Sequence, residues 1–154
     1  SRPDGYYDLI IAHPECTALC VSGNRHYGEG MPKHARRLES ARWTENLWNL
    51  CKLKAKSVAF ENPVGVLSRL TGIPKAGYVQ PWQFGHMEQK KTGIHLHNLE
   101  PLKTTDNVHA AMMLLPKNER ERIHYLPPSA DRWKIRSTTY QGIADAMAKQ
   151  WGNT

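Results

Sequence analysis

Two short apolar runs, each followed at once by a loop that carries a chemically reactive side chain, constrain this chain more than any other feature. The first run, residues 8–12, leads into His13-Pro14-Glu15-Cys16. The second, residues 57–60, leads into Glu61-Asn62-Pro63. Short apolar runs bounded by turn residues are typical of buried strands. The pattern therefore predicts two strands that carry a thiol and a carboxyl group at their carboxyl ends.

The segment between these runs predicts how the strands pair. From His34 to about Lys54 the pattern is helical, and its apolar stripe of Trp43, Leu47, Leu50 and Cys51 is the face expected to be buried. A strand, a helix and a strand in succession indicate a parallel pair with a right-handed crossover. Residues 92–96 alternate enough for a further strand. We therefore predict an α/β fold with a mostly parallel sheet, flanking helices and an antiparallel edge, in which ligands bind at the carboxyl ends of the strands.

The remaining sequence is less informative. A chain of 154 residues is long enough for one domain. Thr138 to Gln141 resembles a capping box, and Ile143, Met147 and Trp151 then form a helical stripe expected in the core. Residues 98–131 contain four prolines and give no clear pattern, so no role is predicted for them.

The net charge of +7 is concentrated in three segments. The cationic residues are Lys33, Arg36, Arg37, Arg42, Lys52, Lys54 and Lys56; Lys90 and Lys91; and Arg132, Lys134 and Arg136. Phosphate contacts require such clusters, because their binding releases counterions. The charge pattern is therefore compatible with a nucleic-acid partner.

The cysteine count and the hydropathy pattern point to a reduced, cytoplasmic protein. Cys16, Cys20 and Cys51 make an odd number, and residues 1–7 lack the zones of a signal peptide. No apolar run reaches 18 residues, so no membrane span is expected. His13, Cys16 and Cys20 have a workable spacing for zinc, but no second pair of ligands follows, so no metal site is predicted.

Both loop motifs resemble those of a known enzyme family. Residues 8–17 resemble the Pro-Cys motif of DNA cytosine-5 methyltransferases, and Glu61-Asn62-Pro63 resembles their Glu-Asn-Val motif. More closely, the chain resembles a short methyltransferase-like family found mainly in bacteriophages and prophages. The stretches that match this second family extend along the chain: Val21-Ser22-Gly23, residues 61–65, residues 80–86, Lys91-Thr92, Arg136-Ser137-Thr138 and residues 142–148.

This resemblance implies a single, partial Rossmann-like methyltransferase domain over residues 1–154, acting on DNA with S-adenosylmethionine as the methyl donor. Cys16 would be the nucleophile, Glu61 would face N3 of the target cytosine, and Asn62 would hold the loop as part of the substrate site. Residues 85–91 loosely resemble the later Gln-x-Arg region that supports the target base. Lys90, Lys91 and Arg136 are candidates for phosphate contacts.

The two reactive groups suit this chemistry. Addition of a thiolate to carbon 6 of cytosine makes carbon 5 nucleophilic, and protonation or hydrogen bonding at N3 makes the addition easier. The target base must also be rotated out of the duplex, because a stacked ring is inaccessible. We therefore expect the side chains of Cys16 and Glu61 to converge on one pocket sized for a pyrimidine.

The chain departs from the family pattern in three places. Glu15 replaces the second proline of Pro-Pro-Cys, and a carboxylate beside the thiol would oppose thiolate formation. Pro63 replaces the valine of Glu-Asn-Val. No Phe-x-Gly-x-Gly cofactor loop precedes Asp8, and Gly28-Glu29-Gly30 has no strand before it. The sequence therefore reads as beginning in mid-domain: either an N-terminal segment is missing from it, or the protein has lost the methyl-donor half.

Two alternatives to a methyltransferase remain open at this point. One is a catalytically inactive DNA-binding or anti-defence phage protein on a degenerate methyltransferase fold. The other is a different cytosine-activating enzyme, such as a nucleotide hydroxymethylase, which activity on free dCMP would distinguish. The cofactor-binding residues, the DNA target sequence and the oligomeric state are not predicted.

Overall fold

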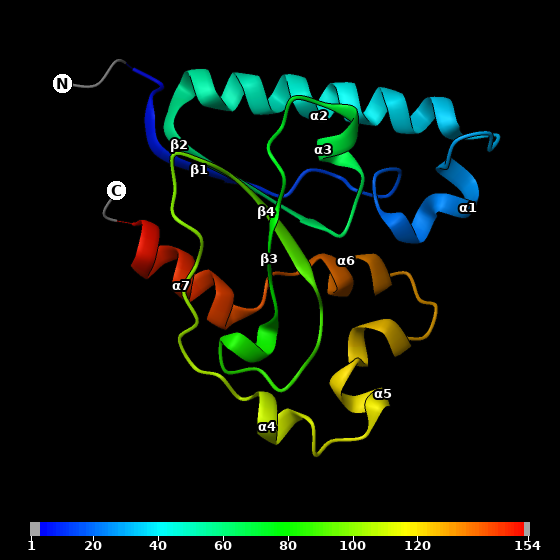
Figure 1. Ribbon diagram of the computed structural model, residues 1–154, viewed down its shortest axis with the longest axis vertical. Helices are drawn as coiled ribbons and strands as arrows, with labels where there is room; N and C mark the ends of the chain where they lie inside the picture. Colours follow the sequence, from blue (N-terminus) through cyan, green and yellow to red (C-terminus); the bar gives the residue numbers. More distant parts are fainter. Residues whose placement is uncertain (1–3, 153–154) are drawn as a thin grey trace. The chain divides into compact units, whose positions relative to one another are not determined.

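The computed structural model describes residues 4–152, which form an α/β fold with a four-stranded mixed sheet and helices (Figure 1). The chain divides into two compact units. The first contains the residues up to Tyr78 together with Thr92–Pro101, and the second contains Val79–Lys91 and the residues from Leu102 onward. That residues 1–154 form one methyltransferase-like domain stays a prediction.

The elements follow one another along the chain with short connections. The strands are β1 (Tyr7–Ala12), β2 (Ala55–Pro63), β3 (Gly77–Val79) and β4 (Thr92–His97). The α-helices are α1 (Asn24–Tyr27), α2 (His34–Lys54), α3 (Leu67–Leu70), α4 (His109–Met112), α5 (Lys117–Arg120), α6 (Arg132–Ser137) and α7 (Gln141–Trp151). Short 3₁₀ turns cover Val21–Gly23, Pro81–Gln83 and Arg122–Tyr125.

The sheet has the strand order β1-β2-β4-β3. β1 pairs with β2 in parallel, which confirms the predicted strand–helix–strand unit, and β4 pairs with β2 antiparallel. β1–β2 is the one parallel pair, so the expectation of a mostly parallel sheet is wrong. β4 also lies inside the sheet rather than at its edge. The segment between β2 and β4 contains the short helix α3, the edge strand β3 and a 3₁₀ turn, and no long helix that would cross over the sheet to make a parallel pair.

Helix α2 has the predicted bounds, and of the predicted stripe Cys51 is buried and Leu47 packs against the core, but the buried face is turned away from Trp43 and Leu50. Its buried residues are Arg37, Ala41, Thr44, Trp48 and Cys51. Trp43 and Leu50, which were expected in the core, are 58% and 51% exposed. The small side chains of Ala41 and Thr44 let the helix approach the sheet closely, and Trp48 packs edge-on against Phe60 with ring centroids 5.0 Å apart.

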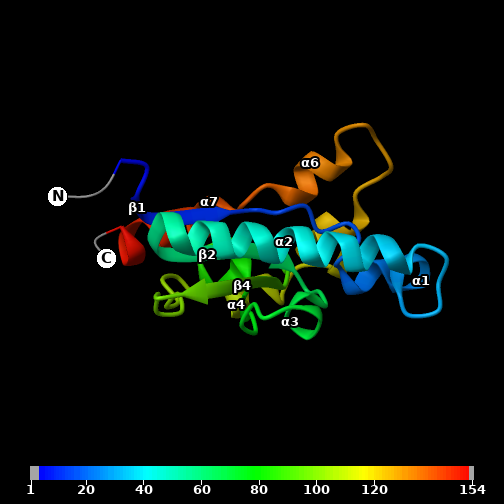
Figure 2. The same cartoon turned by 90° about the horizontal axis from the view of Figure 1, so that it is seen from above.

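The core of the first unit lies between α2 and the β1–β2 pair. Figures 1 and 2 both place α2 alongside these two strands. β2 is buried along most of its length, and Val58, Ala59 and Phe60 have no exposed surface. The buried residues of this core are Leu19, Ala41, Trp48, Cys51, Ala55, Val58, Phe60, Leu67 and Ile73. A firmly packed central strand therefore supports the residues at its carboxyl end.

In the second unit, helix α7 confirms the predicted stripe, because Ile143, Met147 and Trp151 are all buried. The predicted capping box is wrong. The helix begins at Gln141 with Tyr140 at the N-cap position, and no side chain caps it. The Thr138 hydroxyl instead donates to the Lys134 carbonyl oxygen, 2.7 Å away, at the end of α6.

None of the helices formed by residues 4–152 combines the length and the apolar character that a membrane span requires.

The two tryptophans of α2 provide a matched test of the helix orientation. We expect Trp48→Ala to lower the free energy of unfolding by about 3–5 kcal/mol, because it empties a buried site against Phe60. Trp43→Ala should change it by less than about 0.5 kcal/mol, because that side chain is mostly exposed. Urea denaturation of both variants measures the difference. Equal losses would contradict the orientation of α2.

Candidate functional site

The carboxyl ends of β1 and β2 bring two of the sequence motifs together in the first unit. The strands are parallel and Ala12 pairs with Phe60, so His13 and Glu61 are the next residues along neighbouring strands. Their side chains are in contact, with His13 Nδ1 3.5 Å from Glu61 Oε2. The Glu61 side chain is only 9% exposed. An acid predicted from sequence thus lies nearly buried at this edge.

Asn62 joins the same two segments by a second contact. β2 runs through Pro63, beyond the predicted strand end, so Glu61 and Asn62 lie within the strand and pair with β4 on their other side. In the amide orientation that satisfies its neighbours, the nitrogen of Asn62 donates to the carbonyl oxygens of Pro14 and Glu61, both 3.2 Å away. Asn62 is buried and therefore anchors the loop that contains Cys16 to β2.

The backbone after Cys16 forms a turn that packs closely against the segment after β2. The Cys16 carbonyl oxygen accepts the N–H groups of Leu19 and Cys20 at 2.9 and 3.0 Å. The Val66 N–H donates to the Leu19 carbonyl oxygen at 2.9 Å. A Cβ at Gly65 would lie 2.5 Å from that oxygen, so only glycine allows this approach. The Glu-Asn-Pro-Val-Gly stretch thus ends on a residue that the loop geometry requires.

Arg37 of α2 holds the same turn from the helix side. Its guanidinium donates to the carbonyl oxygens of Ala18 and Cys20 at 2.6 and 3.0 Å, and to Asn24 Oδ1 at 2.9 Å. The side chain is buried. Its inclusion among the residues suited to phosphate contacts is therefore wrong. The planar fork of donors fixes the loop that carries Cys16.

Cys16 is partly exposed, and the loop contacts tie its segment to that of Glu61. That the two side chains share a pyrimidine-sized pocket stays a prediction. The three cysteines form no disulfide within residues 4–152. In the same range no group of three His, Cys, Asp or Glu side chains is placed to hold a metal ion, and His13 contacts Glu61.

In the second unit two further family-like stretches pack on each other. Within residues 80–86, Gln80 and Gln83 cap the 3₁₀ turn, and Gly85 has a φ of 90° that favours glycine. The N–H of Gly142, near the start of α7, donates to His86 Nε2 at 2.9 Å. A Cβ on Gly142 would lie 2.1 Å from the Phe84 carbonyl oxygen. Glycine is therefore needed where α7 meets this stretch.

The candidate phosphate-binding residues lie in the second unit, and the structure brings two of them together. The Lys90 ammonium donates to the carbonyl oxygen of Arg136 and lies 5.8 Å from the centre of the Tyr140 ring. Lys90 is partly buried, whereas Lys91 and Arg136 are exposed. Lys90 thus has a structural contact at the end of α6.

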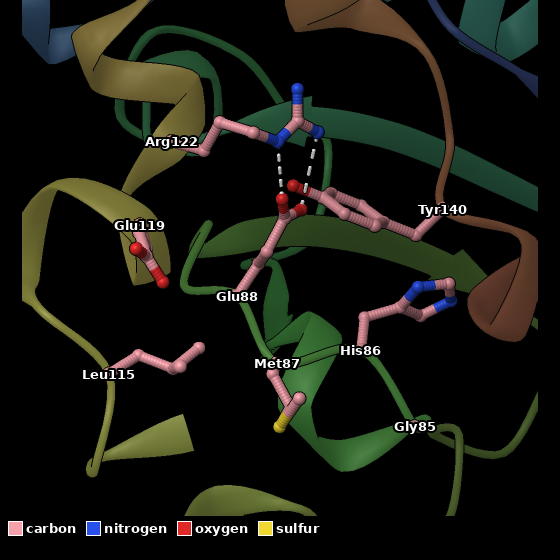
Figure 3. Close-up of a pocket in the computed structure, with 8 residues that line it drawn as sticks. All are labelled: Gly85, His86, Met87, Glu88, Leu115, Glu119, Arg122 and Tyr140. Carbon is pink, nitrogen blue, oxygen red and sulfur yellow. Dashed lines mark hydrogen bonds and ion pairs between the residues drawn. The ribbon is translucent and has the colours of Figure 1, made fainter. Parts of the chain in front are cut away.

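A pocket of about 560 Å³ lies within the second unit (Figure 3). It is lined by Gly85, His86, Met87, Glu88, Leu115, Glu119, Arg122 and Tyr140. Figure 3 shows the Glu88 carboxylate facing the Arg122 guanidinium, with the Tyr140 hydroxyl beside it. Arg122 Nε donates to Glu88 Oε1 at 2.5 Å, and one terminal nitrogen lies 3.4 Å from Oε2. A bidentate ion pair therefore forms one wall of the pocket.

The environment of this ion pair shifts the pKa values of its members. Burial alone would raise the pKa of Glu88, but the hydrogen bond and charge of Arg122 outweigh it and lower that pKa below its ordinary value. Burial raises the pKa of Tyr140 well above its ordinary value, and the neighbouring Glu88 carboxylate adds to this rise. Glu88 is therefore ionised and Tyr140 neutral at neutral pH.

Sequence reasoning missed Arg122 and Tyr140. Glu88 lies in residues 85–91, whose expected resemblance to a region that supports the target base stays a prediction. Arg122, however, comes from a segment with no readable periodicity, 34 residues along the chain. In the sequence Arg122 is only a basic residue in a proline-containing segment, and many surface residues fit that description. Tyr140 lies within residues 138–141, which the sequence pattern predicts as a capping box, and nothing in that pattern indicates a pocket residue.

No family model matches this chain, and no curated protein is similar to it. The methyltransferase-like resemblance therefore stays a prediction from the sequence motifs.

The close approach at Gly65 can be tested with a matched glycine. Gly65→Ala should lower the free energy of unfolding by about 1–3 kcal/mol, because the new methyl group would press on the Leu19 carbonyl oxygen. Gly77→Ala is the control, since a Cβ there meets no atom within 4 Å. Urea denaturation compares the two variants. A Gly65 variant as stable as the Gly77 variant would show that the loops do not meet this closely.

The Glu88 pair predicts a pH-dependent stability. A carboxyl whose pKa is lowered in the folded state stabilises the protein above the ordinary glutamate pKa of 4.5, and this contribution is lost as the pH falls through the lowered value. Glu88→Gln should therefore unfold at a lower urea concentration than wild type at pH 7, and the difference should shrink at pH 3. Glu119→Gln, an exposed change in the same pocket, is the control. A difference that is constant with pH would contradict the ion pair's role.

Proposed function

We propose that this chain is a DNA cytosine-5 methyltransferase-like protein whose strand-end loops activate a cytosine for methylation at carbon 5. Cys16 is the nucleophile, Glu61 is the acid that faces N3, and Asn62 holds the Cys16 loop as part of the substrate site. The observation that carries this proposal is the parallel pairing of β1 and β2, which sets the two motif segments side by side.

Three contacts support this arrangement. His13 touches the Glu61 carboxyl, and the Asn62 amide holds Pro14. The backbone after Cys16 meets the segment after Glu61 at Gly65. A parallel pair joined through α2 also suits the partial Rossmann-like methyltransferase domain of the proposal, in which ligands bind at the carboxyl ends of the strands.

The activating step transfers one proton and forms one bond. The Cys16 thiolate attacks carbon 6 of the cytosine, and the sulfur–carbon bond forms as the π electrons of the 5,6 double bond move to form a double bond between carbons 4 and 5. The π electrons between carbon 4 and N3 move to N3, which takes the proton of the Glu61 carboxyl. The product is nucleophilic at carbon 5. Near-burial of Glu61 shields this proton transfer from water.

S-adenosylmethionine is the methyl donor that the family resemblance implies, but the described residues do not fit the expected cradle. Gly28-Glu29-Gly30 follows helix α1, whereas a glycine-rich cofactor loop follows a strand and opens a helix. We therefore assign no residue of this chain to the methyl donor.

DNA is the proposed partner, with Lys91 and Arg136 as its exposed phosphate contacts and Lys90 beside them. A second candidate function is a DNA-binding or anti-defence protein without methyl transfer. The observation that favours it is the poor fit of residues 28–30 to a cofactor loop. Both functions use the same basic surface and differ in the fate of the bound cytosine.

The thiolate addition can be tested without a methyl donor. DNA that carries 2-pyrimidinone in place of one cytosine offers an electrophilic carbon 6, so the protein should form a covalent adduct with it. Intact-protein mass spectrometry measures the adduct. Cys16→Ala should abolish it, and Glu61→Gln should slow its formation by at least about a hundredfold, the usual scale of a general acid.

Cys51→Ala is the matched cysteine control. Cys51 is buried and burial raises the pKa of its thiol, so this variant should keep the adduct. Binding to ordinary DNA with no adduct in any protein would support the non-catalytic candidate. An adduct that survives Cys16→Ala would exclude Cys16 as the nucleophile.

A further inference from the structure

We infer that helix α6 is a nucleic-acid docking element in which Trp133 stacks on an unstacked base while Arg132, Arg136 and Lys90 contact the flanking phosphates. This inference rests on the proposed function in one respect, that the polyanion bound is DNA. It adds an element and a mode of contact that the strand-end chemistry does not include. The helix is coloured orange in Figure 1.

Trp133 is exposed to an unusual degree for its size. The side chain is 71% exposed, and it makes no ring contact with another described aromatic residue. The other tryptophans of the second unit, Trp82 and Trp151, are partly or fully buried. A flat aromatic surface left in water on a basic helix is what base stacking requires.

The charges around Trp133 cannot be explained by helix stability. Arg132 and Arg136 are four residues apart, so the two like charges lie one turn apart on the helix and repel each other. The helix dipole favours a cation in the last turn, which accounts for Arg136, but it opposes Arg132 in the first turn. A polyanion bound along this face removes both penalties.

A fourth residue extends the cationic face. The Lys90 ammonium donates to the Arg136 carbonyl oxygen, which sets its charge at the carboxyl end of α6. Asp131 stands at the N-cap position and offsets part of the charge there. Within α6 itself there is no acidic residue, and Lys134 is a further exposed cation.

The geometry of a short helix places the aromatic ring beside the arginines. At about 100° of rotation per residue, Arg132, Arg136 and Trp133 fall within about 100° of arc on one side of α6. A nucleic-acid strand likewise presents a base beside its phosphates. A cationic face with one adjacent ring therefore matches a strand in which at least one base has left the stack.

The test compares a nucleic acid with a polyanion that has no bases. The full chain is titrated against a fluorescently labelled single-stranded DNA and against heparin, at several salt concentrations. Trp133→Ala should weaken DNA binding at least about fivefold, the lower end of one base-stacking contact, and should leave heparin binding unchanged. Trp133→Phe should retain most of the DNA affinity. Arg136→Gln should weaken both ligands and lower the salt slope for DNA by about 0.7.

The controls come from other exposed residues of the same types. Trp43→Ala removes another mostly exposed tryptophan, and Lys149→Gln removes an exposed cation of α7. Both should bind DNA like wild type. Far-ultraviolet circular dichroism and the urea midpoint should be the same for the Trp133 variants as for wild type, because the ring is exposed. Trp133→Ala binding DNA as tightly as Trp43→Ala would overturn the inference, as would an equal loss for heparin.

Failure of the inference is distinguishable from failure of the proposed function. A Cys16-dependent adduct together with DNA binding that ignores Trp133 would remove the docking element alone. DNA binding that depends on Trp133 without any adduct would remove the catalytic proposal alone.

Discussion

The register between β1 and β2 is the constraint on which the candidate site depends. Ala12 lies opposite Phe60 in a parallel pair, so the residues that follow these two reach the same sheet edge in step. Because side chains alternate between the faces of a strand, a slip of one residue would turn Glu61 to the opposite face. The contact of His13 with Glu61 follows from this register.

The strand–helix–strand unit could be predicted from sequence because each element carries its own periodic signal. The buried face of α2 could not be predicted in this way. Periodicity selected the stripe of Trp43, Leu47, Leu50 and Cys51, of which Trp43 and Leu50 are exposed. The buried face instead contains Ala41 and Trp48, and Trp48 packs against Phe60 of the sheet. Hydropathy alone therefore could not identify the buried face of this helix.

In the candidate site too, some residues have a local sequence signal and others do not. Cys16 and Glu61 stay predictions as site residues, and their two segments could be located from sequence because each follows a short apolar run. Arg37 looks like one cation among many in the sequence, yet it is buried and donates to two carbonyl oxygens of the Cys16 loop and to Asn24 of α1. Arg122 finds Glu88 across 34 residues of sequence. Partners that distant depend on the tertiary fold, so no local pattern could have named them.

The two steps of the proposed reaction make different demands on the chain. Thiolate addition needs a nucleophile, a proton donor and a base that has left the stack, and the segments after β1 and β2 supply the first two. Capture of a methyl group also needs a donor, for which residues 28–30 are poorly arranged. Because addition to carbon 6 is reversible and precedes methyl capture, a protein without a donor would still bind and activate the base. The catalytic hypothesis therefore requires the strand-end geometry and a sulfur–carbon bond to Cys16, whereas the DNA-binding hypothesis requires neither.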